Sequence, residues 1–416
     1  MNSSNLGFKR WLTDNCYIIF AVFAFLTFYY DAPDIIRPVF FLGIAVLNIR
    51  TVKMAGMNRV VFLYFFAAFL SLTGSLIRPY PISFFFTDMY WAYLPIIFYF
   101  IGTRSCDEYP VFYQRSLWAF MFIFVVGFYF LVFPTERYIT KTLEILNLHH
   151  QYNEETYMYA RFSSFMDSYH TSNLGVCALC FGFGLLKKGS NNNMTIKLLA
   201  VTSITISFIA IMLAQQRAAM YIGIIILIYY LLANSRRNKN GGIVTIVVLG
   251  VLMVIAIYYY WGYFGEDFFN QIKGRFSKDT ISTLVSSRSN QWVDAFDGFL
   301  IEPLFGLGVG SGGHLAVDIG LKPVVTDGSY FKILLEGGVA SFIPFMIILV
   351  SSLIKGFKER ERYYVEFPLL FFFACSMIGA NVIDMPYIIM FMWYIIGRIN
   401  STSSRKQISL NYYGQR

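Results

Sequence analysis

The sequence predicts an all-α polytopic integral membrane protein, and three observations support this fold class. Hydrophobic residues make up 57% of the 416 residues and charged residues only 14%, whereas an ordinary soluble domain has about 25% charged residues. Apolar runs of roughly 20 residues, the length that crosses a bilayer, recur almost from end to end. Lys and Arg gather in the short polar segments between these runs.

About twelve apolar runs are expected to cross the membrane as helices. The predicted spans are residues 16–31, 34–49, 60–77, 87–102, 116–133, 169–186, 197–214, 218–234, 243–262, 328–354, 364–380 and 383–397. The second and twelfth are short, and the last two form either two spans or a re-entrant pair. Lys9 and Arg10 precede the first run, as in a signal peptide. No small-residue cleavage site follows that run, so we expect a retained span rather than a signal peptide.

The distribution of basic residues predicts that both termini lie in the cytoplasm. In this orientation the short inner segments carry most of the Lys and Arg, as the positive-inside rule requires. The chain, residues 1–416, is then one transmembrane domain with two long periplasmic loops, residues 134–168 and 263–327. Long ordered loops usually carry function, so we expect the chemistry on this outer face.

Composition and spacing exclude several classes of protein. The net charge of +9 is scattered in short clusters, so there is no basic face for nucleic acid. Four of the five cysteines lie in apolar runs, which excludes a secreted disulfide framework. The four histidines show no His-x-x-x-His spacing, and we expect neither a metal nor another cofactor.

Three arginines on the predicted outer side suggest a site for a phosphate-bearing ligand. Arg161 lies in the first long loop, Arg217 ends the short connection between two spans, and Arg288 lies in the second long loop. A guanidinium binds phosphate oxygens through two parallel hydrogen bonds and keeps its charge. For Arg217 a second interpretation stays open, in which the side chain only reaches toward the membrane interface.

The segment around Arg288 is expected to form a helix. Ser286 and Ser287 are suited to cap a helix that begins near Arg288. Trp292 then lies one turn further along the same face. The alternative is an interfacial amphipathic helix with a cation–π contact between Arg288 and Trp292.

Two carboxylates and two histidines are further candidates. Asp327 precedes a predicted span and is suited either to cap that helix or to act as a general base on a hydroxyl group. Glu336 lies two turns deeper, where a carboxylate must pair or face a cavity. His170 at the mouth of the sixth span and His314 in the second loop are each either a hydrogen-bonding surface residue or a base.

A Gly-rich run occupies residues 306–313. It lacks the preceding strand, the following helix and the Lys-Ser/Thr pair of a nucleotide-binding loop. We expect a flexible turn that allows close approach of the backbone to a sugar or a phosphate.

Four stretches of the chain occur in a characteristic order and spacing. They are Ala160–Phe165 with Asn173–Gly175, Gln215–Ala219, Ser287–Gly310 and Asp327–Val339. Together they resemble the O-antigen polymerase (Wzy type) and O-antigen ligase superfamily of bacterial envelope glycosyltransferases. The resemblance covers roughly residues 155–345; each motif is degenerate alone, but the ordered set is fairly specific.

The resemblance implies a GT-C-like protein of the bacterial inner (cytoplasmic) membrane with its active site on the periplasmic face. It implies a metal-independent, inverting glycosyl transfer from an undecaprenyl-diphosphate-linked donor to an undecaprenyl-diphosphate-linked repeat unit. Arg217 and Arg288 would hold the diphosphate and stabilise its developing charge, and Arg161 would assist or position sugar. Asp327 would be the general base, with His314 behind it.

Further substrate contacts and partners follow from the same resemblance. The residues expected to contact substrate are Arg161, His170, Trp292, His314, Tyr330 and Glu336. Sugar rings would stack on Trp292 or Tyr330. The expected partners are an undecaprenyl-diphosphate-linked oligosaccharide, membrane lipid, and a chain-length regulator and a flippase of the same pathway.

Two rival functions stay open. An O-antigen ligase, which transfers glycan to lipid A-core, shows a His-Asn pair where this chain has Asp327 and Gly328, and this departure favours a polymerase. The polymerase pattern of Arg, ten residues and Gly follows neither Arg217 nor Arg288, however. A lipid-linked oligosaccharide flippase should line its core with charges, whereas the predicted spans here are almost free of charge.

Overall fold

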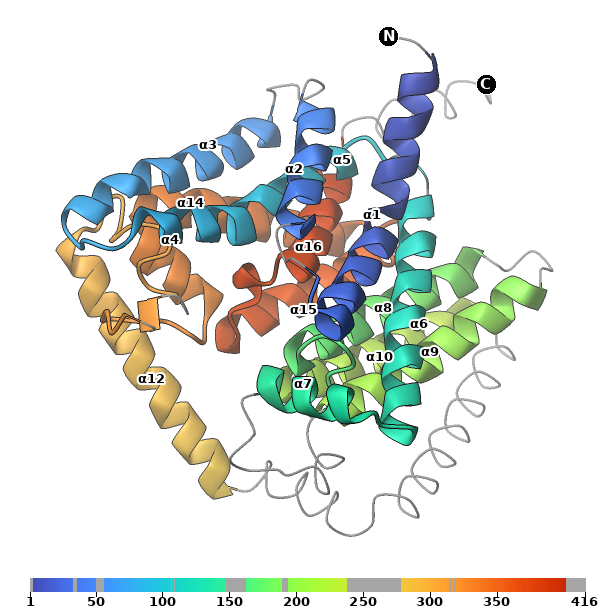
Figure 1. Cartoon of the computed structure of the whole chain (residues 1–416). Coiled ribbons are helices and arrows are strands. Elements are labelled where there is room, and N and C mark those ends of the chain that lie inside the picture. The colour runs from blue at the N-terminus through green and yellow to red at the C-terminus, as the bar shows by residue number, and fades with distance from the viewer. Residues whose placement is uncertain are drawn as a thin grey trace, which may run out of the picture. The chain divides into compact units, whose positions relative to one another are not determined.

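The structure is a computed structural model of the chain, and its described regular elements are helices (Figure 1). It describes residues 3–32, 36–49, 56–105, 107, 109–146, 162–188, 194–237, 278–313, 316–317 and 319–401. Over these residues the prediction of an all-helical fold is confirmed.

The chain divides into two compact units. Unit 1 comprises Met1–Arg37 and Tyr109–Ile281, and unit 2 comprises Pro38–Glu108 and Ser282–Arg416. Each unit therefore combines segments that are distant in sequence. The prediction of a single transmembrane domain is not tested by this division and stays a prediction.

Among the residues that the structure describes, six helical segments are long and apolar enough to cross a membrane. They are Gly7–Tyr30, Met57–Leu76, Ile82–Gly102, Val111–Val132, Met194–Ala214 and Ser329–Lys358. Four shorter apolar helices lie at Pro38–Asn48, Arg217–Ala233, Glu366–Gly379 and Pro386–Ile399. The predicted span 169–186 is a helix that is not among these candidates, and the predicted span 243–262 lies outside the described residues. Twelve spans and the position of the termini therefore stay predictions.

Unit 1 is built around closely packed helices. Its helices are α1 (Ser3–Tyr30), α6 (Val111–Val132), α7 (Glu136–Leu146), α8 (Ser168–Lys188), α9 (Met194–Ala214) and α10 (Arg217–Arg237). Glycines on α8 allow α9 to approach, since a Cβ atom at Gly175 or Gly182 would lie 2.6 or 2.7 Å from the Cγ1 atoms of Ile211 and Ile204. Small residues at helix contacts serve the same purpose in membrane bundles.

Unit 2 is built around α16 (Pro386–Ile399), all of whose residues are buried. The other helices, of which α2 and α12 begin a few residues within unit 1, are α2 (Ile36–Ile49), α3 (Met57–Leu70), η1 (Ser71–Leu76), α4 (Ile82–Asp88), η2 (Met89–Tyr93), η3 (Leu94–Ile96), α5 (Ile97–Gly102), α12 (Lys278–Ile301), α14 (Ser329–Lys358), α15 (Glu366–Gly379) and η5 (Val382–Asp384). Gly102 on α5 and Gly397 on α16 face the backbone of the partner helix so closely that neither position has room for a Cβ atom. Backbone contact therefore fixes α5 against α16.

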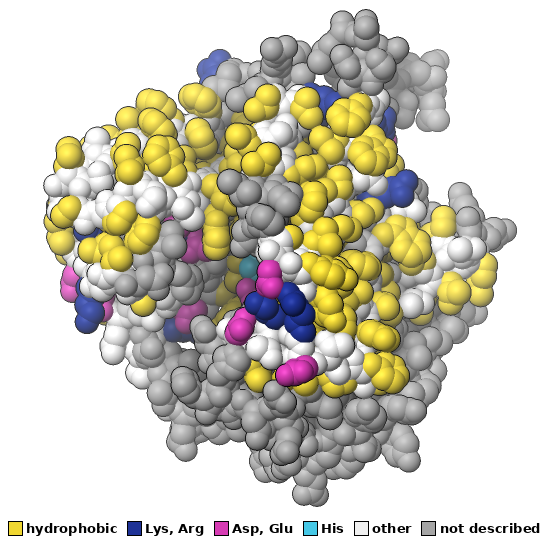
Figure 2. Space-filling view, in the orientation of Figure 1, with side chains coloured by type: hydrophobic (Ala, Val, Ile, Leu, Met, Phe, Trp, Pro, Cys, Tyr) yellow, Lys and Arg dark blue, Asp and Glu magenta, His cyan; other side chains and the backbone are white. Residues whose placement is uncertain are grey.

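The outward face of α3 is hydrophobic (Figure 2). Phe62, Phe66 and Phe69 are exposed along it, while Tyr64 and Ala68 on the opposite face are buried against the unit. A helix that exposes large apolar side chains is suited to contact lipid.

α14 is broken at Gly338, where the backbone adopts φ 58° and ψ −165°. The break leaves backbone N–H and C=O groups of α14 without partners in the helix. The Gly-rich run and the residues just before it form hydrogen bonds with these groups. Leu307 and Gly308 donate backbone N–H groups to the carbonyls of Leu335 and Glu336 at 2.8 and 3.0 Å. Val339 and Ala340 donate in turn to the carbonyls of residues 303 and 304. An interrupted helix at membrane depth is tolerated only where its backbone groups are satisfied in this way.

The Gly-rich run is therefore a packed element, and the prediction of a flexible turn is wrong. Residues 306–313 are all buried. A Cβ atom at Gly306 would lie 2.5 Å from the backbone of Glu336, and one at Gly310 would lie 2.6 Å from the carbonyl of Phe84. The close backbone approach that the sequence predicted does occur, but its partner is the protein's own backbone.

Candidate active site and buried charge cluster

α12 presents one arginine to the segment that precedes α14. The Nε atom of Arg288 donates to Oδ2 of Asp327 at 3.2 Å. The side chains of Arg288 and Asp327 are 29% and 27% exposed, so both ends of the pair reach the surface of unit 2. We call Arg288, Gln291, Trp292 and Asp327 the α12 site.

Two further residues of α12 fix the backbone at Asp327. Trp292 donates its indole N–H to the carbonyl of Asp327 at 3.2 Å. The Oε1 atom of Gln291 accepts from the backbone N–H groups of Thr326 and Asp327, at 3.2 and 3.3 Å, and from the Thr326 hydroxyl. Residues 288, 291 and 292 lie on one face of a helix, so the predicted shared face of Arg288 and Trp292 is confirmed.

Two predicted capping roles are wrong. α12 begins at Lys278, so the serines before Arg288 lie inside the helix and do not cap it. At the start of α14 the N-cap position is Gly328, with a left-handed backbone and no capping side chain. Asp327 pairs with Arg288 instead.

The predicted aromatic platforms are half-buried. The Trp292 ring stacks on Phe331 with ring centroids 5.0 Å apart and planes 9° apart. Tyr330 donates its hydroxyl to the carbonyl of Ala374 at 2.8 Å. One face of Trp292 and the polar end of Tyr330 are thus engaged within the protein, and a role in binding sugar stays a prediction.

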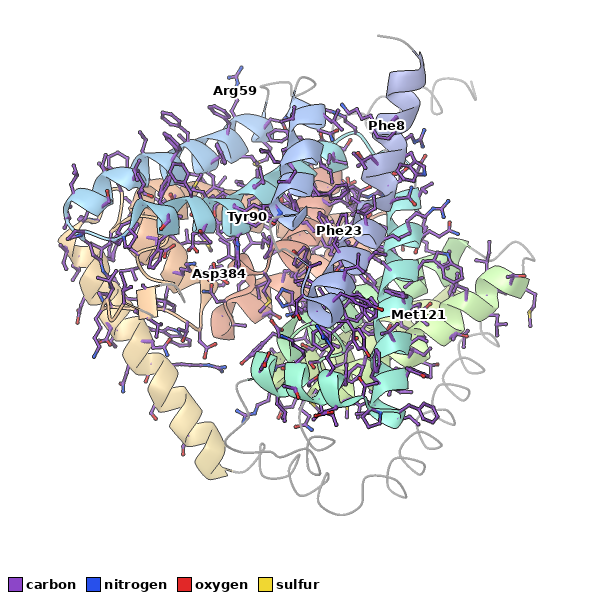
Figure 3. All side chains as sticks on the ribbon, viewed as in Figure 1. Phe8, Phe23, Arg59, Tyr90, Met121 and Asp384 are labelled. Atoms are coloured by element: carbon purple, nitrogen blue, oxygen red, sulfur yellow. The ribbon has the colours of Figure 1, made fainter. Side chains whose placement is uncertain are left out.

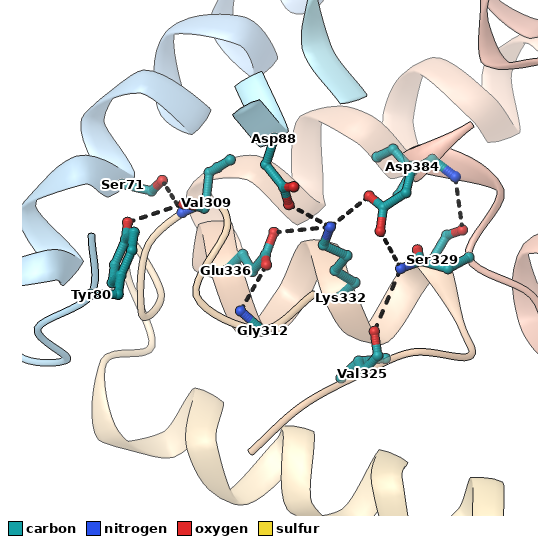
Figure 4. Close-up of polar contacts among 12 residues, drawn as sticks. Ser71, Tyr80, Asp88, Val309, Gly312, Val325, Ser329, Lys332, Glu336 and Asp384 are labelled. Carbon is teal, nitrogen blue, oxygen red and sulfur yellow. Dashed lines mark hydrogen bonds and ion pairs between the residues drawn. The ribbon is translucent and has the colours of Figure 1, made fainter. Parts of the chain in front are cut away.

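A buried charge cluster lies within unit 2 (Figure 4). The Nζ atom of Lys332 lies 2.6 Å from Oδ2 of Asp88, 2.5 Å from Oδ1 of Asp384 and 3.8 Å from Oε2 of Glu336. The Lys332 side chain is only 2% exposed. Gly312 donates its N–H to Oε1 of Glu336 at 2.9 Å. We call Asp88, Lys332, Glu336 and Asp384 the Lys332 cluster.

The Lys332 cluster contradicts the prediction that the spans are almost free of charge. Asp88, Lys332 and Asp384 come from three different predicted spans, and Figure 3 places Asp384 among the packed side chains. The sequence contained a signal, because Lys332 and Glu336 are four residues apart in an apolar span and face one another on a helix. The predicted need of Glu336 for a partner is confirmed.

The Lys332 cluster is connected to the α12 site through the segments around it. Asn381 donates to Oδ2 of Asp384 at 2.6 Å and to the carbonyl of Val325 at 3.5 Å. The Ser329 hydroxyl donates to the carbonyl of Ala380 at 3.0 Å. Asp327 lies between Val325 and Ser329, so buried hydrogen bonds hold the chain on both sides of it.

The predicted residues of unit 1 gather at two neighbouring helix N-termini. Asp167 caps α8, since its Oδ1 atom accepts the backbone N–H of His170 at 2.6 Å. Its Oδ2 atom lies 2.6 Å from Nδ1 of His170. Gln216, which directly precedes Arg217 at the start of α10, donates to the Ser168 hydroxyl at 3.1 Å. The structure therefore brings the start of α8 beside the start of α10.

The surroundings of Asp167 favour the ionised form of its carboxyl. Burial by itself raises the pKa of Asp167. The contacts with His170 and with backbone N–H groups together lower it by more, so the pKa lies below its usual range. His170 thus faces a carboxylate, which fixes the orientation of its ring. His170 therefore makes a hydrogen bond at the mouth of a helix, and whether it also acts as a base stays a prediction.

The predicted site residues fall into two groups. His170 and Arg217 belong to unit 1, and Arg288, Trp292, Asp327, Tyr330 and Glu336 belong to unit 2. Arg161 and His314 lie outside the described residues. Sequence reasoning missed Gln291, Lys332, Asp88 and Asp384. Over the part of the chain that the structure describes, no group of three or more His, Cys, Asp or Glu side chains could hold a metal ion.

Apolar helices of membrane-spanning length and a half-exposed pair of charged residues define a multi-pass membrane protein with a polar site. Residues 202–346 match the family model Wzy_C, described as O-antigen ligase. This match confirms, over residues 202–346, the resemblance to the O-antigen polymerase and ligase superfamily. The matched region extends across both units and includes Arg217, Arg288, Asp327 and Glu336. No curated protein matches the chain.

Proposed function

We propose that the protein is a repeat-unit polysaccharide polymerase of the bacterial inner membrane. It transfers glycan from an undecaprenyl-diphosphate-linked donor to an undecaprenyl-diphosphate-linked acceptor on the periplasmic face, with inversion and without a metal. The match to a family described as O-antigen ligase supports glycosyl transfer of the ligase or polymerase type. The Arg288–Asp327 pair is the observation that carries the assignment of the site.

Arg288 is suited to bind a diphosphate. Asp327 holds the guanidinium through Nε, and among the described residues no acceptor binds its Nη atoms. A guanidinium fixed along one edge presents its other donors in a planar fork, which matches two phosphate oxygens. In the transfer the glycosidic bond to the diphosphate breaks, and preorganised donors at the departing phosphate stabilise its charge.

Arg217 is also proposed to bind phosphate. It begins α10 and lies half-buried beside the capped start of α8. Helix N-termini favour anions because their N–H groups and dipoles point toward the ligand. Arg161 would complete the set and position sugar, and Tyr330, Trp292 and His170 would contact the glycans.

Asp327 is proposed as the general base. Its Oδ2 atom is engaged by Arg288, whereas no donor among the described residues binds Oδ1. Oδ1 can therefore accept the proton of the acceptor hydroxyl while that oxygen attacks the anomeric carbon. His314 remains the second candidate for the base.

Different observations argue against the two rival functions. The family match does not separate a polymerase from a ligase, so this choice rests on Asp327 and Gly328 standing where a ligase shows His-Asn. A flippase is opposed by the family match, but the argument from uncharged spans no longer applies, because the Lys332 cluster is present.

The first test is the surface glycolipid profile of a strain that lacks this protein. A polymerase predicts that a ladder of repeats collapses to a single-repeat band, since export and ligation continue. Loss of every repeat would indicate a ligase or a flippase and overturn the proposal.

Point variants test the phosphate-binding role. Arg217→Ala and Arg288→Ala are each expected to lower ladder formation by about 10²-fold or more at normal protein levels, since each removes a donor to the departing diphosphate. Arg59→Ala is the control, because Arg59 points outward from α3 (Figure 3). A normal ladder with Arg288→Ala would remove that residue from the mechanism.

A further inference from the structure

Arg78 is a buried arginine that has no counter-ion among the described residues. It is 7% exposed, and its Nη1 atom donates to the carbonyl of Pro323 at 2.9 Å. Its Nε and Nη2 atoms are buried and have no hydrogen-bond partner in the described segments. Within the described part of the chain no carboxylate lies within ion-pair distance of it. Sequence reasoning did not single out this residue.

Arg398 provides a direct contrast within the same unit. It is also 7% exposed, but its Nε atom donates to Glu366 at 2.6 Å and its Nη1 atom to the Ser105 hydroxyl at 3.0 Å. Burying a charged group is costly unless an opposite charge and hydrogen bonds replace its hydration. Arg398 meets this condition within the protein, whereas Arg78 does not.

Glu336 offsets only part of the cost at Arg78. Burial lowers the pKa of the Arg78 guanidinium, and the more distant carboxylate of Glu336 raises it by less. That carboxylate is already engaged by Gly312 and Lys332. Arg78 therefore lacks the anion that its position requires.

The place of Arg78 in the chain indicates where such an anion would come from. Arg78 lies in the short connection between two membrane-length segments, which end at Leu76 and begin at Ile82. Leu76, Ile77, Ile82 and Phe86 are exposed apolar side chains around it. The end of a span lies at the level of the lipid headgroups, where phosphate is the abundant anion.

We propose that Arg78 is a binding site for the phosphate group of a membrane lipid, with the acyl or prenyl chain lying along the apolar side chains beside it. The phosphate belongs either to a phospholipid or to a polyprenyl diphosphate carrier. Binding turns the Arg78 side chain toward the headgroups and breaks a single hydrogen bond, the one to Pro323. This site stands whether or not the protein transfers glycan.

The test is lipid binding to the full-length protein in detergent, measured by native mass spectrometry and by the unfolding temperature. The probes are undecaprenyl diphosphate, phosphatidylglycerol and undecaprenol, which lacks phosphate. Arg78→Met and Arg78→Lys are compared with Lys322→Met. The control removes the same charge from an exposed residue next to Pro323.

Arg78→Met is expected to bind one phosphate-bearing lipid fewer, with affinity at this site weakened about 30-fold or more. Arg78→Lys should retain part of the binding, and Lys322→Met all of it. If Arg78→Met weakens the binding of undecaprenyl diphosphate alone, the ligand is the carrier lipid. If it also weakens the binding of phosphatidylglycerol, Arg78 is a general phosphate site. The binding of undecaprenol should be the same for the wild type and for all of these variants.

The unfolding temperature without lipid separates this role from a structural one. Removing an unpaired buried charge should leave that temperature unchanged or raise it, so Arg78→Met is expected to fold. Unchanged lipid binding by Arg78→Met would overturn the proposal, as would a lower lipid-free unfolding temperature with the response to lipid intact. Arg288→Ala, measured alongside, tests the proposed active site separately.

Discussion

The Lys332 cluster and the α12 site use the same kinds of charged groups in opposite ways. In the cluster one ammonium lies within 4 Å of three carboxylates, and every member is buried. In the α12 site one guanidinium meets one carboxylate, and both are more than a quarter exposed. A buried charge with complete partners has no donor left for a ligand and is costly to break, whereas a charge that keeps unused donors at the surface can bind a ligand.

The comparison therefore predicts that changes in the cluster affect stability and that changes in the α12 site affect activity. The segment between Val325 and Ser329 joins the two. Buried hydrogen bonds hold its ends, and α12 holds Asp327 in its middle.

The largest effect is expected from Lys332→Met. The change leaves three buried carboxylates without their cation, and breaking such a pairing costs about 3–5 kcal/mol. We expect the protein to be lost from the membrane, measured as its amount by immunoblot. Lys322→Met is the matched control and should accumulate normally, and a normal amount of Lys332→Met would show that the cluster does not support the fold.

Asp327→Asn is expected to affect activity rather than stability. It removes the proposed base with little change of shape, and ladder formation should fall by about 10²–10⁴-fold at an unchanged protein level. Asp297→Asn, at an exposed position on α12, is the control. Full activity with Asp327→Asn would exclude Asp327 as the base and leave His314 as the candidate.

Gln291→Leu should have a smaller effect. Its Oε1 atom accepts three hydrogen bonds from residues 326 and 327, and unsatisfied donors cost about 1–3 kcal/mol. The backbone at Asp327 would loosen, so we expect about a tenfold loss of ladder formation with the protein level retained. Asn290→Leu, at the exposed neighbouring position, should retain activity. Equal activity of the two variants would contradict a positioning role for Gln291.

The smallest effect is expected at the end of α1, where Asp31 pairs with Arg137 and Lys141 of α7. Figure 2 shows basic and acidic side chains gathered over α7. The hydrogen bond from Lys141 is the main cause that lowers the pKa of Asp31. An aspartate with a lowered pKa in the folded state stabilises the fold when the pH is above the usual pKa of an aspartate. This stabilisation is lost as the pH falls through the lowered pKa.

Exposed pairs contribute little and are screened by salt. Asp31→Asn should therefore differ slightly from the wild type in unfolding temperature at pH 7 and low salt, and not at all in strong acid. A large difference at pH 7 would mean that exposed pairs matter here as much as buried ones.

Local patterns in the sequence predicted much of the fold. Apolar runs predicted the helices because burial in lipid requires length and composition, which are properties of contiguous residues. The ordered motifs predicted the family for the same reason. Arg288 and Trp292 could be placed on one face because helix periodicity is local.

The tertiary structure decided which charges are paired. Lys332 binds Asp88, 244 residues away, and Asp384, 52 residues away, and no periodicity relates such positions. It also decided that Asp327 pairs with Arg288 and that the Gly-rich run packs against the broken α14. The sequence by itself determined the helices and the candidate charges. Whether a charge is buried with complete partners, buried alone like Arg78 or left half-exposed depends on segments far apart in the chain, because burial and pairing exist only once those segments pack together.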